Sequence, residues 1–130
     1  MARLAAERGY FLDTYAMIEY LSGNRSYAAY FESGRLATSL LNLAELYYRV
    51  LFERGKDEAE STYTAFRAYQ GEITHEDITL GMQLRLRRRA GGSNLSYTDA
   101  IGYAMSERMG LRFLTGDKAF KAMGNVEFVK

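Results

Sequence analysis

The chain has 130 residues, of which 48% are hydrophobic and 25% are charged. This balance is typical of one globular domain and excludes a disordered or collagen-like chain. Cysteine is absent and His75 is the one histidine, which excludes a disulfide framework, a thiolate zinc site and a multi-histidine metal site. The formal net charge of +1 gives no overall attraction to nucleic acid, so such a partner would need a local basic patch.

Short apolar runs and longer amphipathic segments alternate along the chain. The pattern predicts, in chain order, a strand at 10–12, helices at 15–21 and 27–31, a strand at 36–38, helices at 40–54, 56–69, 74–90 and 96–110, and strands at 113–115 and 126–129. This alternation predicts an α/β fold, a three-layer α/β/α sandwich with a mainly parallel central sheet. We expect residues 1–9 to form an N-terminal tail and residues 10–130 to form a single domain.

Two of the expected helices carry recognisable start signals. Thr74 with Asp77, and Ser96 with Asp99, have the spacing of capping boxes. The helix at 74–90 also has two apolar stripes, one through Ile78, Met82 and Leu86 and another through Leu80 and Leu84. A helix that is apolar on two sides is either deeply buried or shared with a partner.

Four acidic residues are the candidates for chemistry: Asp13, Glu45, Asp99 and Asp117. Asp13 ends the first expected strand and Asp117 follows the strand at 113–115, and ligands bind beyond the carboxyl ends of parallel strands. Glu45 has apolar neighbours in its helix, where a buried carboxylate would need a compensating partner. Structural explanations also exist, because each aspartate could cap a helix or turn and Glu45 could lie on a solvent-facing strip.

Taken together, the four acids and their neighbours resemble the PIN-domain ribonucleases, especially the small VapC-type toxins of toxin–antitoxin pairs. The resemblance rests on strand-ending Asp13 and on the segments Asn42-Leu43-Ala44-Glu45-Leu46, Thr98-Asp99-Ala100-Ile101 and Thr115-Gly116-Asp117-Lys118-Ala119-Phe120. It extends from about residue 10 to residue 129. Asn42 stands where these toxins often have Thr.

The resemblance implies a PIN-like fold and a metal-dependent endoribonuclease that cuts RNA. It implies Asp13 and Asp99 as direct metal ligands, with Glu45 and Asp117 completing the acidic pocket and Thr115 orienting a water or ligand. Oxygen ligands without Cys or His suit Mg²⁺ or Mn²⁺. Two carboxylates about 4 Å apart repel by about 4 kcal/mol at an effective dielectric constant of about 20, so such a cluster stays ionised if a cation neutralises it.

Basic and aromatic residues could contact the RNA. Arginines gather at the end of the helix at 74–90, with two lysines near Asp117: Arg85, Arg87, Arg88, Arg89, Lys118 and Lys121. Cations at a helix C-terminus also interact favourably with the helix dipole, so both explanations of the arginines stay open. Four tyrosines could stack on bases or belong to the core or an interface: Tyr15, Tyr20, Tyr47 and Tyr48.

The expected partners are an RNA substrate, a cognate antitoxin and a second copy of the chain, since the resemblance also implies a homodimer. No signal peptide or membrane span is apparent in the sequence, so we expect a cytoplasmic protein with no membrane partner. Two alternatives stay open. One is a PIN-domain nuclease that processes RNA without an antitoxin, and the other is a catalytically silent module that binds RNA or protein.

Overall fold

A computed structural model describes residues 9–32 and 34–130 of the chain. The predicted tail, residues 1–9, lies outside the described residues except for Gly9, so the tail stays a prediction. Within the described residues the strands β1 (Tyr10–Leu12), β2 (Leu36–Ala37), β3 (Arg112–Thr115) and β4 (Val126–Phe128) form one sheet. The strand order is β2-β1-β3-β4, and every neighbouring pair is parallel.

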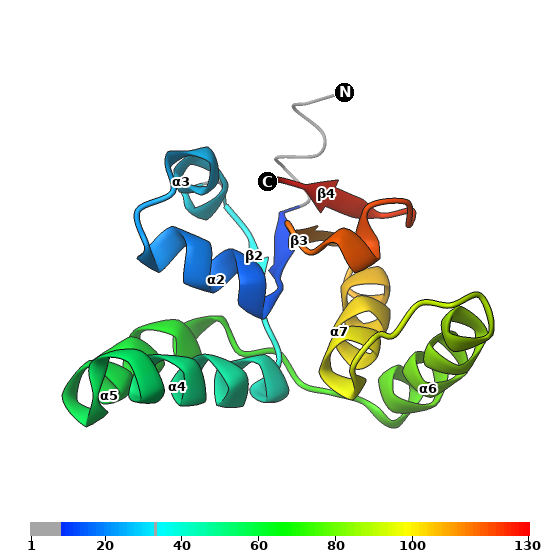
Figure 1. The fold of residues 1–130 in the computed structure, drawn as a ribbon, viewed down its shortest axis with the longest axis horizontal. Coiled ribbons are helices and arrows are strands. Elements are labelled where there is room, and N and C mark those ends of the chain that lie inside the picture. The colour runs from blue at the N-terminus through cyan, green and yellow to red at the C-terminus, as the bar shows by residue number, and fades with distance from the viewer. Residues whose placement is uncertain (1–8, 33) are drawn as a thin grey trace.

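Helices cover this sheet (Figure 1). The α-helices are α2 (Thr14–Leu21), α3 (Arg25–Phe31), α4 (Leu40–Arg54), α5 (Lys56–Phe66), α6 (His75–Ala90) and α7 (Tyr97–Arg108), and the short 3₁₀ helices are η1 (Arg67–Tyr69) and η2 (Lys118–Phe120). Both predicted capping boxes are present, at the starts of α6 and α7. The helix predicted at 56–69 is α-helical to Phe66 and tightens into η1 over its last turn.

Side-chain alternation along the strands builds a core on each face of the sheet, because successive residues of a strand point to opposite faces. Tyr10, Leu12 and Leu114 pack on one face with residues of α2 to α5. Phe11 and Phe113 stack on the other face, in a cluster with residues of α7 and η2. The two clusters confirm the predicted three-layer α/β/α arrangement with a parallel central sheet.

The buried face of α4 differs from the apolar stripe that is easiest to find in its sequence. Leu40, Leu43, Tyr47 and Leu51 recur at helical spacing, but Leu40 and Leu51 are exposed. The helix instead buries Asn42, Leu43, Leu46 and Val50. Both sets have spacings of three and four, so the sequence alone could not choose between two faces that differ by a small rotation.

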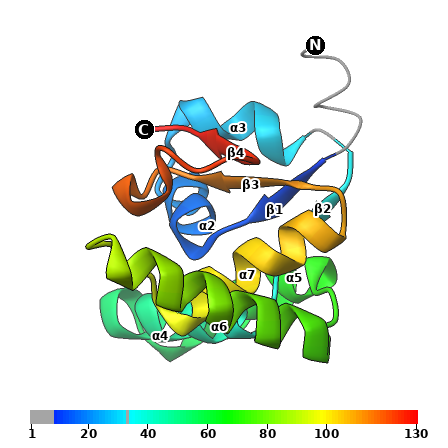
Figure 2. The same ribbon diagram turned by 90° about the vertical axis from the view of Figure 1, so that its right-hand side faces the viewer.

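The helix α7 lies against β1 and β3, and α6 packs on its outer side (Figure 2). The two helices approach closely at Gly81, where an added Cβ would come within 3.0 Å of backbone atoms of Ala100 and Ile101. An ion pair with a 2.9 Å contact joins Asp77, in the first turn of α6, to Arg108, the last residue of α7. These contacts hold α6 against α7.

Much of α6 is exposed, including apolar residues from both of its stripes. Its buried residues are Asp77 and Gly81, whereas Ile78, Leu80 and Leu86 are exposed. Of the two explanations for its double stripe, deep burial is therefore wrong and a surface available to a partner remains. None of the described helices combines the length and apolar character needed to span a bilayer.

Candidate active site

The parallel topology brings three chain segments to one edge of the sheet. Asp13 directly follows β1, and the segment after β3 leads into Asp117. Because α7 precedes β3 and runs back along the sheet, its first turn, which contains Asp99, lies at this same carboxyl edge (Figure 1). The helix α4 follows β2 and brings Glu45 to the site in its second turn.

Asp13 is the buried member of the set, with 3% of its surface exposed. Its Oδ1 accepts a hydrogen bond from the Thr14 backbone N–H (2.9 Å), which caps α2, and its Oδ2 accepts one from the Thr115 hydroxyl (2.6 Å). Burial raises the pKa of Asp13 to about 8, and the nearby charge of Asp99 adds to the increase against the two hydrogen bonds. Without a cation, this carboxyl group favours its neutral form.

Asp99 is half-buried and acts as the acidic residue of the α7 capping box. Its backbone N–H donates to Ser96 Oγ (3.0 Å), and its Oδ2 accepts from the Ser96 backbone N–H (3.0 Å). Burial raises the pKa of Asp99, the capping bonds lower it, and the charges of Asp117 and Glu45 raise it again. The cap fixes the side chain, and the electrostatic coupling identifies its acidic neighbours.

Thr115 and Asp117 form a second hydrogen-bonded link to Asp13. The buried Thr115 hydroxyl, which donates to Asp13, accepts from the Asp117 backbone N–H (3.0 Å). Asp117 caps η2 through a bond from the Ala119 backbone N–H to its Oδ1 (3.0 Å). The capping explanations of the three aspartates are therefore correct as structure. They do not compete with a shared site, because the caps hold these residues at one edge.

Glu45 is exposed, so of its two explanations the buried carboxylate is wrong and the solvent-facing strip is confirmed. It lies on the solvent side of α4, next to the buried Leu46. Its Oε1 accepts a hydrogen bond from the Thr14 hydroxyl (2.7 Å), and Thr14 Oγ1 accepts one from Asn42 Nδ2 (3.0 Å). Asn42 is fully buried and is held in turn by the Ser39 hydroxyl, which donates to its Oδ1 (2.6 Å).

This relay from Ser39 to Glu45 was not found in the sequence. Two features of the sequence could have indicated the relay. Thr14 adjoins Asp13, and Asn42 lies one helical turn before Glu45. The relay explains how an exposed glutamate is directed toward the buried aspartate. Asp13 and Glu45 interact electrostatically, as do Glu45 and Asp99.

The donor set suits a hard divalent cation, because it consists of carboxylate and hydroxyl oxygens. The raised pKa of Asp13 is the expected behaviour of a carboxylate whose charge lacks a counterion. Within residues 9–32 and 34–130, however, no three acidic or histidine side chains converge into a ready-made metal cage. Their oxygen atoms nevertheless fit the chemistry of Mg²⁺ or Mn²⁺.

The basic candidates differ in their contacts and exposure. Arg85 donates from Nε to the Leu95 carbonyl (2.9 Å), and its guanidinium lies 4.6 Å from the ring centroid of Tyr97, at the start of α7. Arg89 and Lys118 are exposed. Arg88 is half-buried and lines a groove between α6 and α7.

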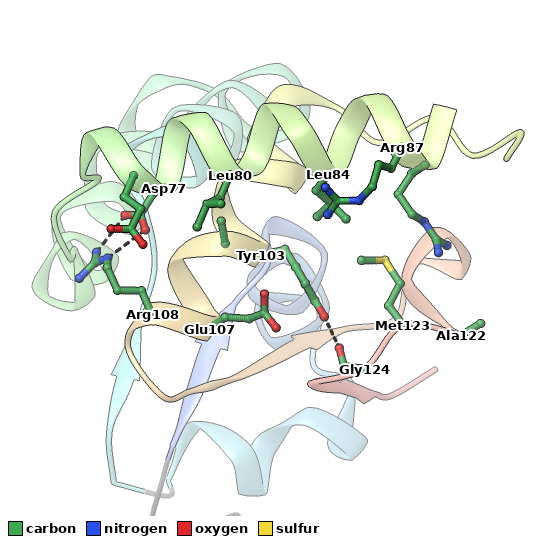
Figure 3. Close-up of a pocket in the computed structure, with 13 residues that line it drawn as sticks. Asp77, Leu80, Leu84, Arg87, Tyr103, Glu107, Arg108, Ala122, Met123 and Gly124 are labelled. Atoms are coloured by element: carbon green, nitrogen blue, oxygen red, sulfur yellow. Dashed lines mark hydrogen bonds and ion pairs between the residues drawn. The ribbon is translucent and has the colours of Figure 1, made fainter. Parts of the chain in front are cut away.

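A groove with a volume of ≈ 770 Å³ lies between α6, α7 and residues 122–124 (Figure 3). Leu80 and Leu84 project from α6 toward Tyr103, and Arg87 lies at one end of the groove. The Asp77–Arg108 ion pair closes the opposite end. The four candidate acids are not among the lining residues, so this groove is separate from the acidic edge.

The tyrosine candidates also differ in their surroundings. Tyr15 and Tyr47 are half-buried against the core, and the exposed Tyr20 stacks on Phe31 with ring centroids 4.0 Å apart. Tyr48 is 69% exposed on α4. Tyr97, which was not among the candidates, is 61% exposed and lies two residues before Asp99.

Solved structures share this fold. A toxin–antitoxin complex from Klebsiella pneumoniae aligns with a TM-score of 0.72 at 20% identity, covering 92% of this chain and 96% of that chain. VapC20 from Mycobacterium tuberculosis, described as a sarcin-ricin loop cleaving toxin, aligns with a TM-score of 0.72 at 20% identity, covering 93% and 97%. VapBC2 from Rickettsia felis, bound to a promoter DNA fragment, aligns with a TM-score of 0.74 at 20% identity, covering 92% and 96%.

No curated protein matches the sequence in a direct comparison. The family model of the PIN domain matches residues 10–126, which is most of the chain. The parallel sheet with a core on each face extends over the same residues. The chain therefore belongs to the PIN domain family.

Proposed function

We propose that this protein is a Mg²⁺- or Mn²⁺-dependent endoribonuclease that hydrolyses RNA phosphodiester bonds, with residues 10–130 acting as a single PIN domain. The observation that carries the proposal is that acids from separate segments interact electrostatically at one edge of the sheet. Asp99 and Glu45 interact with the buried Asp13, whose pKa burial raises to about 8, and Asp117 interacts with Asp99. A carboxyl group that disfavours its own charge is poorly suited to a purely structural role. It is suited to a site that is completed by a cation.

Asp13 and Asp99 are proposed as direct ligands of the cation, with Glu45 and Asp117 completing the pocket directly or through water. When bound, such a cation supplies Lewis-acid activation of water and stabilises the negative charge that develops on a phosphodiester. Thr115 holds Asp13 Oδ2 and so fixes the direction in which its other oxygen is presented. The relay through Thr14 holds Glu45 over the same edge.

Cleavage of end-labelled structured RNAs by the purified protein, in Mg²⁺, Mn²⁺ and EDTA, tests this proposal. We expect metal-dependent cutting that Asp99→Asn lacks. The asparagine keeps an oxygen that can accept the Ser96 backbone N–H, so the α7 cap survives while the charge is removed. Circular dichroism and melting curves verify that the variant is folded.

A fully active Asp99→Asn protein would contradict the assignment of this residue. No cutting in any metal, by folded protein free of an antitoxin and tested on a broad RNA panel, would favour a module that only binds RNA or protein. Asp57→Asn is the matched control, because Asp57 is an exposed acid in the first turn of α5, away from the site. Its cleavage rate should equal that of the unmodified protein.

The cellular role we propose is that of a toxin acting on cytoplasmic RNA and neutralised by a cognate antitoxin. The supporting observation is the shared fold with the toxin–antitoxin complex from Klebsiella pneumoniae. A small upstream gene for a DNA-binding protein would support the pairing. Its absence would favour a PIN nuclease that works without an antitoxin.

We also propose a homodimer, and the exposed apolar residues of α6 suit an interface. Ile78, Leu80 and Leu86 are each at least 41% exposed, which leaves apolar area that a second copy of the chain would bury. Light scattering should give twice the monomer mass, and Leu80→Glu with Leu86→Glu should give the monomer mass. A monomeric unmodified protein at micromolar concentration would contradict this prediction.

A further inference from the structure

We propose that the groove between α6, α7 and residues 122–124 is a docking site for a short, extended segment of a partner protein. The segment that fits has a basic residue at one end, apolar residues in the middle and an acidic residue at the other end. The proposal goes beyond the nuclease function and does not depend on it, because none of the four candidate acids lines this groove.

The middle of the groove is apolar. Leu80 and Leu84 project from α6 toward Tyr103 of α7 (Figure 3). The Tyr103 hydroxyl donates to the Gly124 carbonyl, so the ring is held in place and its polar atom already has a partner. Met123 adds a flexible side chain that can adjust to a bound group. Since Leu80 is 46% exposed, this middle section offers apolar area to a ligand.

One end of the groove is basic. Arg87 lies there, and Arg88, from the same last turn of α6, also lines the groove. Arg88 is half-buried, and its buried Nε has no hydrogen-bond partner among the described residues. The dipole of α6 favours cations at this end but leaves that donor without an acceptor. An acidic group that reaches this end would give the guanidinium groups a partner of opposite charge.

The opposite end of the groove carries acidic residues. Glu76 and Glu107 line it, beside the ion pair between Asp77 and Arg108. Arg108 donates to both carboxylate oxygens of Asp77 and to the Glu72 carbonyl, so its guanidinium is already engaged. Glu107 is exposed, and no cation in the described part of the chain forms an ion pair with it. A basic group of a ligand is therefore favoured at this end.

Tyr103 lies between the two charged ends. Burial raises the pKa of Tyr103, the charge of Glu107 raises it further, and the charge of Arg88 lowers it. The twelve helical steps from Glu76 to Arg88 span about 18 Å, the length of about five or six extended residues. The groove volume of ≈ 770 Å³ also lies within the range of ligand sites, about 300–1,000 Å³. These dimensions suit a short extended segment better than a whole helix.

The separation of charge favours a peptide over a nucleic acid. Phosphates would be attracted by Arg87 and Arg88 but repelled by Glu76 and Glu107. A fatty acid could pair with the arginines, but its apolar tail would then lie against the two glutamates. A peptide can carry both charges with leucine-like side chains between them. The occupant most complementary to the groove is therefore a peptide segment with one charge of each sign.

The test is fluorescence anisotropy with three labelled hexapeptides, each acetylated and amidated so that side chains supply the charges. The probes are Lys-Ala-Leu-Leu-Ala-Glu, Glu-Ala-Leu-Leu-Ala-Glu and Lys-Ala-Leu-Leu-Ala-Lys. We expect the unmodified protein to bind the first probe roughly 3- to 30-fold more tightly than the other two, because each of those places a like charge at one end. Replacing both leucines of the first probe with serine should abolish binding.

Glu76→Lys with Glu107→Lys makes both ends of the groove basic and should switch the preference to the probe with two glutamates. Both residues are exposed, so the fold should survive, which circular dichroism verifies. Arg89→Glu is the matched control, because Arg89 is an exposed arginine on α6 outside the groove. It should keep the preference of the unmodified protein.

Equal binding of the three probes would overturn the proposal, and so would a preference that the Glu76→Lys, Glu107→Lys variant does not change. Absence of binding to any probe would also overturn it. Light scattering then identifies a further occupant, because a dimer that the same variant converts to monomer would assign the groove to a second copy of the chain. None of these results depends on RNA cleavage, so a failure of the nuclease proposal is recognised separately.

Discussion

Asp13→Asn should abolish RNA cleavage and, at the same time, raise the melting temperature of the metal-free protein. The buried carboxyl group has a pKa of about 8 against an ordinary value of 3.8. At neutral pH the folded protein must therefore keep this group protonated, which costs free energy that an amide does not incur. The asparagine oxygen can still accept the Thr14 backbone N–H, so the α2 cap is kept. Its amide nitrogen replaces the oxygen that accepts from the Thr115 hydroxyl, and this lost hydrogen bond offsets part of the gain. At pH 7.5 in EDTA, we expect the free energy of unfolding to rise by roughly 2–4 kcal/mol.

The pH dependence of this effect has a definite sign. Between the unfolded pKa of 3.8 and the folded pKa of about 8, the folded state holds a proton that the unfolded state has lost. Raising the pH through this window therefore destabilises the protein, and the penalty is complete above the folded pKa. Below the unfolded pKa it vanishes. The difference between Asp13→Asn and the unmodified protein should grow steadily from acidic to neutral pH.

Thermal melts in EDTA and in Mn²⁺ across this pH range measure both effects. Mn²⁺ should raise the melting temperature of the unmodified protein and have a smaller effect on Asp13→Asn, because a cation binds the ionised ligand. Asp57→Asn, at an exposed position, should change stability by less than about 1 kcal/mol at any pH. A lower melting temperature for Asp13→Asn in EDTA at pH 7.5 would mean that its charge stabilises the metal-free fold.

The sequence was most informative where local rules determine the structure. The capping boxes at Thr74 and Ser96 were predictable because each cap uses atoms within three residues. The strands were predictable because apolar runs too short for a helix alternate with capped helices. The topology then followed, since parallel strands joined by helices place their carboxyl ends at one edge. This reasoning was sufficient to expect Asp13 and Asp117 near each other.

The features that escaped prediction depend on contacts between distant segments. The exposure of Glu45 depends on which face of α4 meets the sheet, and the sequence offers two apolar faces. The bond from Thr115 to Asp13 joins residues that are 102 positions apart. Asn42 has no recognisable motif of its own, although it is fully buried and linked to Thr14. Such residues become visible once the fold places them together.

Thr14→Val, which breaks the relay that ends at Glu45, should lower both the stability of the protein and its cleavage activity. Valine has nearly the shape of threonine but lacks the hydroxyl group that donates to Glu45 and accepts from Asn42. The buried amide of Asn42 would lose its acceptor, so the free energy of unfolding should fall by roughly 1–3 kcal/mol. Glu45, no longer held, should leave cleavage and apparent metal affinity weaker by roughly 10- to 100-fold.

Thr14→Ser is the matched control, because serine keeps the hydroxyl group and should retain both stability and activity. Mn²⁺ titrations, followed by cleavage and by melting temperature, separate the two consequences of Thr14→Val. A purely structural role would lower the melting temperature without changing the Mn²⁺ concentration for half-maximal cleavage. If Thr14 holds Glu45, the Mn²⁺ concentration for half-maximal cleavage should rise in Thr14→Val. Adding Glu45→Gln to Thr14→Val should then lower cleavage little further, because both changes affect the same interaction. Full additivity of the two substitutions would show that Glu45 acts independently of the relay.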